Sequence, residues 1–408
     1  MIRSLMLFRL ARRSVWRNKR RSLLTLSAIA AGILSAVMLG ALARGLSDTA
    51  IRAAIRNLTG HVQLHAPGYL DDPSIEYRLP EVSGSLQRVL DSEAVSSWTQ
   101  RVRVPAVLRS EREATGVTLL GVSPAKELDL SMLGDAAILG RMVRDENDDG
   151  LLLGVKLAEL LQTEIGKRVV VLSQGADGGV AERGFRVVGL FDAELESAER
   201  QFIFTGRVPA QELLGIKGEV SEVVLLGQDR DALEELQRTL QRAAPRAQID
   251  DWKTLEPFAV ALVKVQSGFL FIWYGIVIVT ISFGLVNTLF MAVFERTREL
   301  ALLQALGMVP HQIVLQILIE SAVLLVGGVL LGNILTYVCL VWLSEGIDLG
   351  SFAEGTQMLG VGRVIYPKLQ WVDWSIANSL IVGLSLFASV FPAWHAGRLR
   401  PAEAFATA

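Results

Sequence analysis

The stretch Glu295–Gly307, ERTRELALLQALG, lies between two long apolar runs and decides how this chain is organised. Its first five residues are charged or polar, an apolar ladder follows, and a glycine ends it. A helix that spans a bilayer needs about 20 apolar residues, so this segment is too short and too polar to cross one. The stretch predicts a short helix that lies on a membrane surface and is accessible to a soluble partner.

Four apolar runs are long enough to span a bilayer. They are Leu23–Leu42, Val265–Phe294, Ile313–Leu343 and Trp374–Trp394, and Glu320 is the only charged residue in them. The composition agrees, with 51% apolar and 20% charged residues and a mean hydropathy of +0.40. A net charge of −2 gives no global basicity that would indicate nucleic-acid binding. A single cysteine, Cys339, excludes an intrachain disulfide.

Basic residues near the ends of the runs predict the orientation, because cytoplasmic loops are enriched in Lys and Arg. Such residues precede the first run and occur in the short loop and after the last run, namely Arg3, Arg9, Arg12, Arg13, Arg17, Lys19, Arg20, Arg21, Arg296, Arg298, Arg398 and Arg400. We therefore expect a multi-pass membrane protein with both termini in the cytoplasm. A signal peptide cleaved near Ala43 is the alternative, but the basic region and the apolar run are too long for one.

The sequence predicts a membrane protein with four transmembrane α-helices and a large α+β extracytoplasmic domain. The predicted segments are a basic cytoplasmic segment (1–21), a first span (22–44), the extracytoplasmic domain (45–266), a second span (267–294), a cytoplasmic loop with a short helix (295–311), a third span (312–343), an outer loop (344–371), a fourth span (372–394) and a cytoplasmic tail (395–408). In the domain, β-like runs at 101–108, 117–122, 168–172, 185–191, 201–204 and 222–226 alternate with helical patterns at 152–161 and 231–243. The pattern leaves open whether the domain has one body or two subregions.

Small residues predict close helix packing. Ala28, Gly32, Ala36 and Gly40 recur at every fourth position of the first run, and Gly328 and Gly332 form a G-x-x-x-G pair in the third. Small residues let membrane helices approach closely, although an ordinary alanine-rich membrane composition would also produce the first set. In the third run, Glu320 is a functional candidate because a carboxyl group at this depth is unfavourable. Proton coupling is one interpretation, and an interhelical hydrogen bond from the protonated form is the one we favour.

Three local motifs fall short of a catalytic or metal site. Gly166-Lys167-Arg168 lacks the first glycine and the Ser or Thr of a Walker A loop, so this chain is not expected to bind ATP itself. Asp145–Gly150 resembles the first half of a calcium loop, but Lys156 stands where the bidentate glutamate belongs, which favours a solvated acidic turn. His61 and His65 have no third ligand nearby, which favours a surface strand. We expect no catalytic residue, no metal and no cofactor bound by this chain.

The segment 295–307 contains candidate contacts for the soluble partner. On a helix, Leu302, Leu303 and Leu306 share a face, and Gly307 suits the C-cap. The pairs Glu295–Arg298 and Arg296–Glu299 are spaced i,i+3 and would stabilise the first turns. Pro310 suits the first turn of the next helix. A plain interfacial connector is the alternative to a docking helix.

Several motifs resemble those of one family. ERTRELALLQALGMVPHQIV resembles the cytoplasmic loop of ABC permeases of the FtsX/MacB/lipoprotein-releasing superfamily, the type VII transporters. Arg17–Ile33 resembles the opening motif of that family, and Pro392–Ala404 resembles its closing motif. Within the domain, Gly60–Tyr69, Gly121–Pro124 and Arg186–Glu199 are similar to the lipoprotein-releasing branch.

The resemblance implies a non-enzymatic permease subunit of the bacterial inner membrane. It would pair with a second permease copy, as a homodimer or heterodimer, and with a separate cytoplasmic ABC ATPase. ATP and Mg²⁺ would be bound by that ATPase, which would act on Glu295, Arg296, Arg298, Glu299, Leu302, Leu303, Leu306 and Gly307 of this chain. The favoured function is release of lipoprotein or lipid, with a periplasmic carrier or the lipoprotein as a further partner. Alternatives are mechanotransmission to a cell-wall hydrolase and export of a peptide or drug. A membrane-anchored sensor is disfavoured, since only about 14 residues follow the last span and no output domain is seen.

Overall fold

The computed structural model describes residues 19–193, 195–228, 233–348 and 364–398. The chain divides into a helical unit (19–47, 263–348 and 364–398 of the described residues) and a sheet unit, Asp48–Leu262. Parts of several predicted features lie outside the described residues: the basic residues before Lys19, the first two residues of the helical pattern at 231–243, residues 349–363 of the outer loop, and the end of the closing motif with Arg400.

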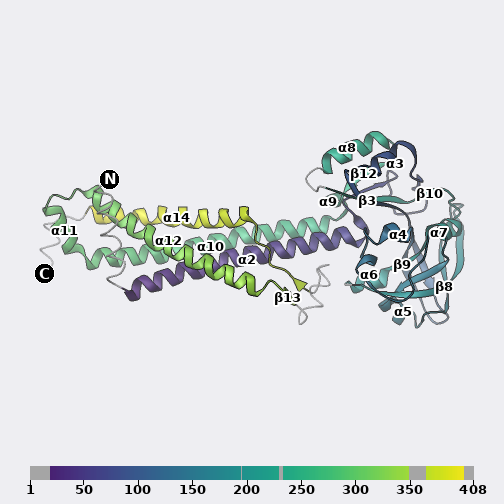
Figure 1. Cartoon of the computed structure of the whole chain (residues 1–408), viewed down its shortest axis with the longest axis horizontal. Coiled ribbons are helices and arrows are strands. Elements are labelled where there is room, and N and C mark those ends of the chain that lie inside the picture. The colour runs from purple at the N-terminus through teal and green to yellow at the C-terminus, as the bar shows by residue number, and fades with distance from the viewer. Residues whose placement is uncertain (1–18, 194, 229–232, 349–363, 399–408) are drawn as a thin grey trace. The chain divides into compact units, whose positions relative to one another are not determined.

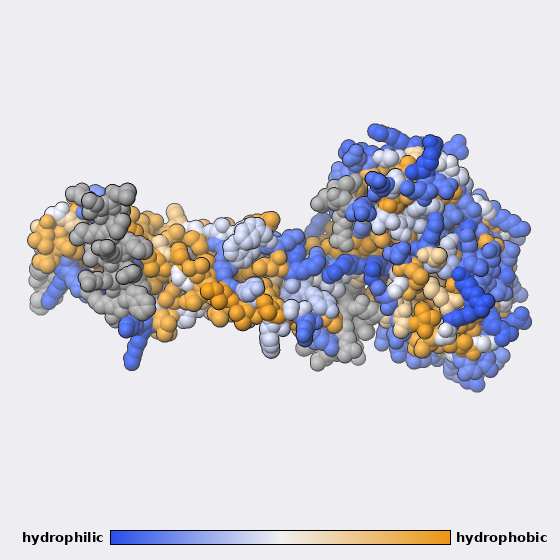
Figure 2. All heavy atoms as spheres, viewed as in Figure 1, coloured by the Kyte–Doolittle hydropathy of each residue, from blue (hydrophilic) through white to orange (hydrophobic). Residues whose placement is uncertain are grey.

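Four helices are long and apolar enough to cross a membrane, as the sequence predicts (Figure 1). They are α2 (Lys19–Ala54), α10 (Pro257–Glu295), α12 (Pro310–Trp342) and α14 (Trp371–Gly397). Apolar side chains cover much of the visible surface of these helices (Figure 2). The short helix α11 (Thr297–Ala305) lies between α10 and α12 in the chain, and β13 (Ile347–Asp348) pairs with β14 (Val364–Ile365) after α12.

Two of the long helices extend beyond their predicted spans. α2 continues past residue 44 to Ala54, and α10 begins at Pro257 rather than at 267. Hydropathy marks only the part of a helix that lies in hydrocarbon, so the polar extensions escaped the prediction. With 39 residues, α10 is about 58 Å long at 1.5 Å per residue, roughly twice the hydrocarbon thickness.

The helical unit has an apolar core to which all four long helices contribute. Its buried members include Ile29, Ile33 and Val37 of α2, Ile281, Leu285 and Leu289 of α10, Ile317, Leu324 and Leu325 of α12, and Ile381 and Ala393 of α14. Polar side chains also join neighbouring helices within this core. The hydroxyl groups of Thr25 and Thr288 lie 2.9 Å apart, and Asn333 Nδ2 donates to Asn378 Oδ1 at 2.9 Å. Such hydrogen bonds are a common way of holding helices together where water is absent.

The sheet unit is built on a ten-stranded mixed sheet with the order β12-β1-β11-β3-β4-β9-β6-β8-β5, in which β7 pairs with both β3 and β8. The strands are β1 (Val62–His65), β3 (Val95–Arg109), β4 (Ala114–Val122), β5 (Ala137–Gly140), β6 (Gly150–Gly154), β7 (Arg168–Gln174), β8 (Val180–Asp192), β9 (Phe202–Gly206), β11 (Glu222–Gly227) and β12 (Gln248–Asp251). A separate pair joins β2 (Leu79–Pro80) to β10 (Glu219–Val220). The pairs β4–β9 and β6–β8 are parallel, and the other pairs are antiparallel.

Strand β3 belongs to two parts of this sheet. Its first half, up to Arg101, pairs with β11, whereas Val102–Arg109 pairs with β4 and β7. From there the pairings close into a ring through β4, β9, β6, β8 and β7 back to β3. Closing a sheet into a ring removes exposed strand edges and encloses a core.

The described part of the sheet unit has three clusters of buried apolar side chains, one of which includes Leu120, Phe191 and Phe204. The ring encloses buried side chains such as Val104, Leu119, Leu153, Phe185 and Ile203. The β12-β1-β11 part packs instead against α3 (Gly84–Leu90) and α8 (Leu233–Ala243). The remaining short helices are η1 (Ile55–Thr59), α4 (Pro124–Glu127), η2 (Met132–Gly134), α5 (Val155–Leu160), α6 (Glu196–Gln201), α7 (Arg207–Leu214) and α9 (Trp252–Leu255). The α+β class is confirmed, and the division of the domain into two subregions stays a prediction.

Local predictions within the domain were mostly confirmed. All six β-like runs coincide with strands, and α8 covers the described part of the helical pattern at 231–243. The helical pattern at 152–161 was wrong in its first part, because Leu152 and Leu153 belong to β6 and pair with β8 and β9. The surface strand with His61 and His65 was also wrong, since β1 lies between β11 and β12 and all four of its residues are buried.

Candidate functional site

The short helix in the segment 295–307 is present and ends as predicted. α11 runs from Thr297 to Ala305, and Gly307 follows its C-cap with a φ of 95°. Gly307 N–H donates to Gln304 O and Met308 N–H to Leu303 O, each at 3.0 Å. This pair of bonds is the Schellman arrangement, which needs a residue in the left-handed region and therefore favours glycine.

The first two residues of the segment do not belong to α11. Glu295 is the last residue of α10, and Arg296 is the N-cap of α11, with a φ of −116°. Arg21 of α2 donates to Glu295 Oε2 at 2.8 Å, and Arg296 Nη1 lies 3.5 Å from Glu320 Oε2. These two residues thus join the segment to the long helices, and their contact with an ATPase stays a prediction. The predicted i,i+3 pairs Glu295–Arg298 and Arg296–Glu299 stay predictions.

Glu320 has its cation partner on the segment itself. Its side chain and that of Arg296 are both almost fully buried where they form their ion pair. The predicted interhelical contact of Glu320 therefore takes the form of an ion pair to the residue that precedes α11. Proton coupling through Glu320 stays a hypothesis.

One side of α11 packs into the helical unit. Leu300 is buried in the same apolar core as Ala393 and Ala396 of α14, and Ala301 is also buried. Gly397, in the closing motif, approaches α12 so closely that an added Cβ would lie 2.8 Å from Val314 Cγ2. The closing motif therefore lies against the first turns of α12, which follow the loop segment, although the two are far apart in the sequence.

The other side of α11 is exposed and mixes charge with apolar surface. Leu302 is 53% exposed and Leu306 77% exposed. Arg298 and Glu299 are also exposed, and Leu303 is half-buried. Large exposed apolar side chains beside charged ones are typical of a surface that another protein covers. We call Arg298, Glu299, Leu302 and Leu306 the α11 outer face.

The predicted small residues bring α2 against two neighbours. A Cβ on Gly32 would lie 2.9 Å from Ile281 Cγ1 of α10, whereas one on Gly328 would lie 2.6 Å from Ile29 Cβ of α2. Gly332 is equally close to α2, with Ile33 Cβ at 2.6 Å and the backbone oxygen of Ala30 at 2.8 Å from its would-be Cβ. Of the predicted stripe on α2, Ala36 and Gly40 are buried, whereas Ala28 is exposed.

Gly332→Ala is expected to destabilise the helical unit by about 1–3 kcal/mol, the usual cost of overpacking a core. The added methyl group would meet the backbone of α2, which cannot move aside as a side chain does. The measurement is the thermal denaturation midpoint of the full chain in detergent. Gly383→Ala on α14 is the control, because its Cβ would meet no heavy atom within 4 Å. Equal midpoints for the two variants would contradict tight α2–α12 packing.

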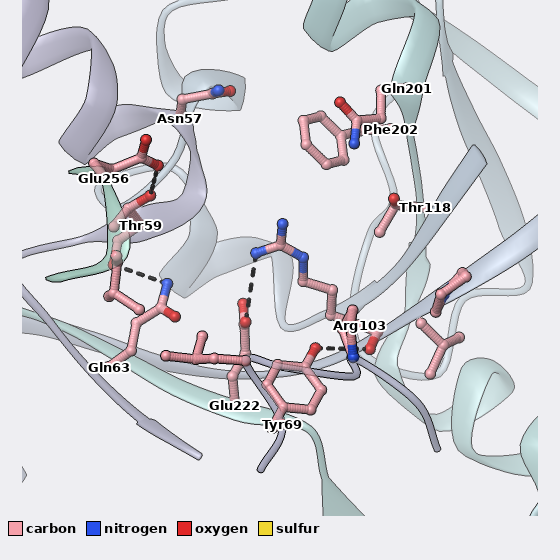
Figure 3. A pocket seen from close by; sticks show the side chains of 15 residues that line it. Asn57, Thr59, Gln63, Tyr69, Arg103, Thr118, Gln201, Phe202, Glu222 and Glu256 are labelled. Atoms are coloured by element: carbon pink, nitrogen blue, oxygen red, sulfur yellow. Dashed lines mark hydrogen bonds and ion pairs between the residues drawn. The ribbon is translucent and has the colours of Figure 1, made fainter. Parts of the chain in front are cut away.

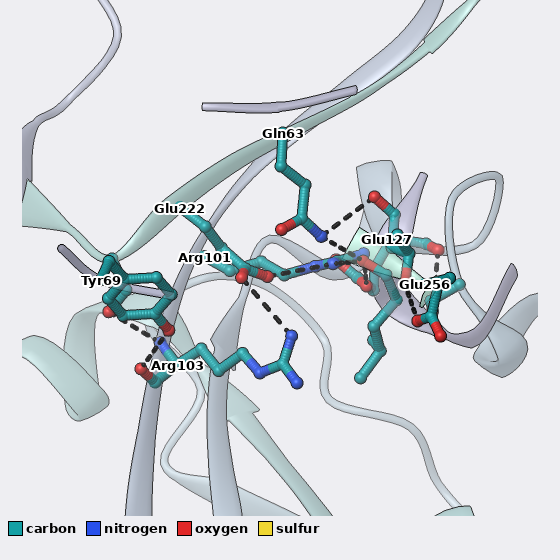
Figure 4. A network of polar contacts seen from close by, with 11 residues as sticks. Gln63, Tyr69, Arg101, Arg103, Glu127, Glu222 and Glu256 are labelled. Atoms are coloured by element: carbon teal, nitrogen blue, oxygen red, sulfur yellow. Dashed lines mark hydrogen bonds and ion pairs between the residues drawn. The ribbon is translucent and has the colours of Figure 1, made fainter. Parts of the chain in front are cut away.

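A buried polar network lies where β3 leaves β11 (Figure 4). Arg101 contacts Glu127 at 2.6 Å and Glu222 at 3.3 Å, and all three side chains are fully buried. Burial alone would lower the pKa of Arg101, but the two carboxylates outweigh it and raise that pKa. Sequence reasoning missed this network because it treated the run at 101–108 only as a strand. The alternation Arg101-Val102-Arg103-Val104 was the available indication that arginines share the face opposite the valines.

The network also holds the chain segment that follows α2. Arg101 Nη1 donates to Leu58 O at 2.5 Å, and Leu58 has a φ of 76°, which is strained for a leucine. One residue further, Thr59 Oγ1 donates to Glu256 Oε1 at 2.7 Å. Glu256 directly precedes α10. Side chains of the sheet unit therefore fasten both chain segments that lead into the long helices.

A cavity of about 410 Å³ adjoins this network (Figure 3). Its lining comes from η1, β1, β3, β4, β9 and β11 and from the residues before α10, and it includes Asn57, Gln63, Arg103, Phe202, Glu222 and Glu256. The Arg103 guanidinium points into the cavity, and Tyr69, whose hydroxyl donates to Arg103 O at 3.0 Å, lies at its wall. Burial, then the nearby Glu222 carboxylate, raises the pKa of Tyr69, so this hydroxyl keeps its proton.

The motifs that the sequence analysis set aside have ordinary structural roles. Asp148, in the acidic turn, lies 2.5 Å from Arg141 and accepts backbone N–H groups of Arg144 and Gly150 at 2.9 Å. Burial tends to raise the pKa of Asp148, but these donors lower it to about 2. His65 is fully buried, with its Nε2 3.1 Å from Asp250 Oδ2. Among the described residues, no group of three or more His, Cys, Asp or Glu side chains could hold a metal ion.

Known proteins match the chain over both of its units. The sequence profile of the MacB-like periplasmic core domain matches residues 22–243, and that of the FtsX-like permease C-terminal region matches residues 271–401. A lipoprotein-releasing system transmembrane protein LolC of Neisseria meningitidis serogroup B is 25% identical over 94% of this chain and 93% of its own length. A LolC of Xylella fastidiosa is 24% identical over 73% of this chain and 75% of its own length. The solved periplasmic region of MacB from Actinobacillus actinomycetemcomitans covers 50% of this chain and 93% of its own, with 13% identity and a TM-score of 0.37.

Proposed function

Since this chain belongs to the ABC transporter permeases that combine a MacB-like periplasmic core domain with an FtsX-like C-terminal region, we propose that it drives the release of lipoproteins from the bacterial inner membrane. The observation that carries the proposal is the likeness to a lipoprotein-releasing LolC protein over 94% of the chain. That likeness extends through both units, so it concerns the extracytoplasmic domain as well as the helices. A separate cytoplasmic ATPase supplies the energy, and a second permease copy completes the transporter.

The α11 outer face is the proposed contact for the ATPase. In the proposed orientation it faces the cytoplasm, where Leu302 and Leu306 offer apolar anchors and Arg298 and Glu299 offer charges. The opposite side of α11 is fixed by the burial of Leu300 and by the Arg296–Glu320 ion pair. A push on α11 would therefore move α12 and α10 with it rather than merely bending a loop.

The long helices offer a route from that push to the extracytoplasmic domain. α10 is continuous from Pro257 to Glu295. At the start of the second apolar run, Gln266 Nε2 donates to Ala43 O at 2.6 Å and Gln266 Oε1 lies 2.5 Å from Ser47 Oγ, which couples α10 to α2. Within the sheet unit, the Thr59–Glu256 hydrogen bond couples the segments next to these helices. In this proposal, closure of the ATPases moves both helices, and the domain expels lipoprotein from the outer leaflet.

Depletion of this chain in its host tests the proposed cargo. We expect lipoproteins to accumulate in the inner membrane, because their release would stop, while outer-membrane proteins without lipid anchors stay in place. The measurement is the distribution of radiolabelled lipoproteins between inner and outer membrane fractions. Re-expression of this chain serves as the control and should restore release, whereas re-expression together with a Walker A variant of the cognate ATPase should not. An unchanged lipoprotein distribution would reject lipoprotein release and favour mechanotransmission or efflux of another substrate.

A further inference from the structure

We propose that the cavity in the sheet unit binds a short extended peptide segment through its backbone amide groups. We define the peptide site by Asn57, Gln63, Arg103, Phe202, Glu222 and Glu256, which line this cavity. The inference depends on the proposed function only for the source of the peptide, which would be the cargo. The binding itself is argued from the chemistry of the cavity.

Arg103 provides hydrogen-bond donors that the sheet unit does not use. Its backbone is engaged, because its N–H donates to Ser221 Oγ and its carbonyl accepts from Tyr69 Oη, both at 3.0 Å. Its guanidinium instead lies over the Phe202 ring at 5.9 Å and 3.6 Å from Glu222 Oε2, with no hydrogen bond to any described residue. The side chain is 31% exposed, toward the cavity. A planar guanidinium held in this way is suited to carbonyl or carboxylate oxygens.

The same cavity also has unused acceptors. Asn57 Oδ1 and Glu222 Oε2 are buried, and neither accepts a hydrogen bond from the described part of the chain. Glu222 is fully buried, and its other oxygen, Oε1, already accepts a hydrogen bond from Arg101 Nη1 at 3.3 Å. Glu222 Oε2 has Arg103 as an ion-pair partner at 3.6 Å, but neither this oxygen nor Asn57 Oδ1 accepts a hydrogen bond from a described residue. A buried oxygen that accepts no hydrogen bond is unfavourable, so a ligand that donates to these oxygens would be stabilised. The cavity thus needs both an acceptor for Arg103 and donors for Asn57 and Glu222.

The charge balance favours a neutral ligand. Arg101 and Arg103 are offset by Glu127 and Glu222, and Glu256 adds a further carboxylate at the wall. A phosphate or other simple anion would be repelled by the Glu256 carboxylate, and the cavity has no net positive charge that would attract such an anion. A peptide amide group is neutral and carries one hydrogen-bond donor and one acceptor. It can therefore accept from Arg103 and donate to Asn57 or Glu222 without adding charge to the cavity.

The size and the apolar walls agree with an extended peptide. The volume of about 410 Å³ falls within the range of roughly 300–1,000 Å³ that is usual for ligand sites. Phe202, Pro105 and Leu70 provide apolar parts of the lining. Successive side chains of an extended peptide point in opposite directions, so one side chain can enter the apolar part while the backbone meets Arg103 and Glu222.

The test is binding of the neutral peptide acetyl-Ala-Leu-Ala-amide to the full chain in lipid nanodiscs, followed by saturation-transfer NMR. We expect the dissociation constant to rise at least about tenfold in Arg103→Gln, because charge-assisted hydrogen bonds are lost. The matched control is Arg183→Gln on β8. Arg183 is 32% exposed and pairs with Glu212. It also lies over an aromatic ring, that of Phe185 at 5.4 Å, but it is not in the cavity lining.

Two further arms make the outcome decisive. Inorganic phosphate and acetate, each up to the peptide concentration, should not displace the peptide. Addition of a palmitoyl chain to the peptide distinguishes the possible sources of the bound peptide. Tighter binding of the palmitoylated peptide would indicate lipoprotein cargo, and equal binding would indicate a peptide of any source. Absence of peptide binding, displacement by phosphate, or equal loss in Arg183→Gln would overturn the peptide site. None of these results depends on lipoprotein sorting in cells, so failure of the peptide site and failure of lipoprotein release are distinguishable.

Discussion

Replacement of Leu302 and Leu306 by glutamate is expected to reduce copurification of the cognate ATPase with the full chain at least tenfold. Both leucines are exposed on α11, at 53% and 77%, and burial of one such side chain contributes about 1.5–3 kcal/mol to an interface. Glutamate would also place charges where a partner must remove water. The measurement is the ratio of ATPase to permease after purification of the coexpressed complex.

A second variant and a control complete this experiment. Reversal of charge with Arg298→Glu and Glu299→Arg keeps the leucines and should also weaken ATPase binding, while the protein stays in the membrane. Leu160→Glu, at a leucine that is 50% exposed on α5 of the sheet unit, should leave the ATPase ratio unchanged. Normal copurification with both α11 variants would contradict the assignment of the α11 outer face.

Arg101→Met is expected to lower the free energy of unfolding of the sheet unit by about 3–5 kcal/mol, because it leaves the buried carboxylates of Glu127 and Glu222 without a counter-charge. The change also removes the donor to Leu58 O, at the strained residue after α2. The measurement is hydrogen exchange of the β3 and β11 amides in the full chain, which should become much faster.

Two comparisons separate loss of charge balance from loss of an arginine. Arg183→Met removes a half-exposed ion pair with Glu212 and should change the free energy of unfolding by about 1 kcal/mol or less. The triple change Arg101→Met, Glu127→Leu and Glu222→Leu removes every buried charge of the network and should regain much of the lost protection. Equal exchange rates in Arg101→Met and the natural chain would show that the network does not stabilise the sheet unit.

The segment 295–307 shows which structural features a local sequence pattern can predict. The turn chemistry of Gly307 and the apolar periodicity of the leucines predicted a short helix and its end, and both were confirmed. The roles of Glu295 and Arg296 were not predictable in this way, because their partners, Arg21 and Glu320, come from other helices. Which charged residues of a helix face outward depends on what packs against it, and this is not a local property.

The peptide site lay beyond sequence reasoning for a similar reason. Arg101 and Glu222 are 121 residues apart in the chain, and the pairing of β3 with β11 places them directly opposite each other. A shift of that pairing by one residue would turn Arg101 and Arg103 to the other face of the sheet, away from Glu222. The residue types alone do not predict the strand register that places these residues together.

The sequence by itself determined the membrane architecture: four spans, one large α+β domain after the first of them, and a short helix between the second and third. It could do so because bilayer thickness and helix rise turn a run of apolar residues directly into a span. The tertiary structure alone decided that α2 and α10 extend past their apolar runs, that Leu300 is buried and Leu306 exposed, and that Arg101, Arg103 and Glu222 meet beside one cavity. These features arise from packing and strand register between distant segments, where the free energy of each residue depends on neighbours that no local pattern specifies.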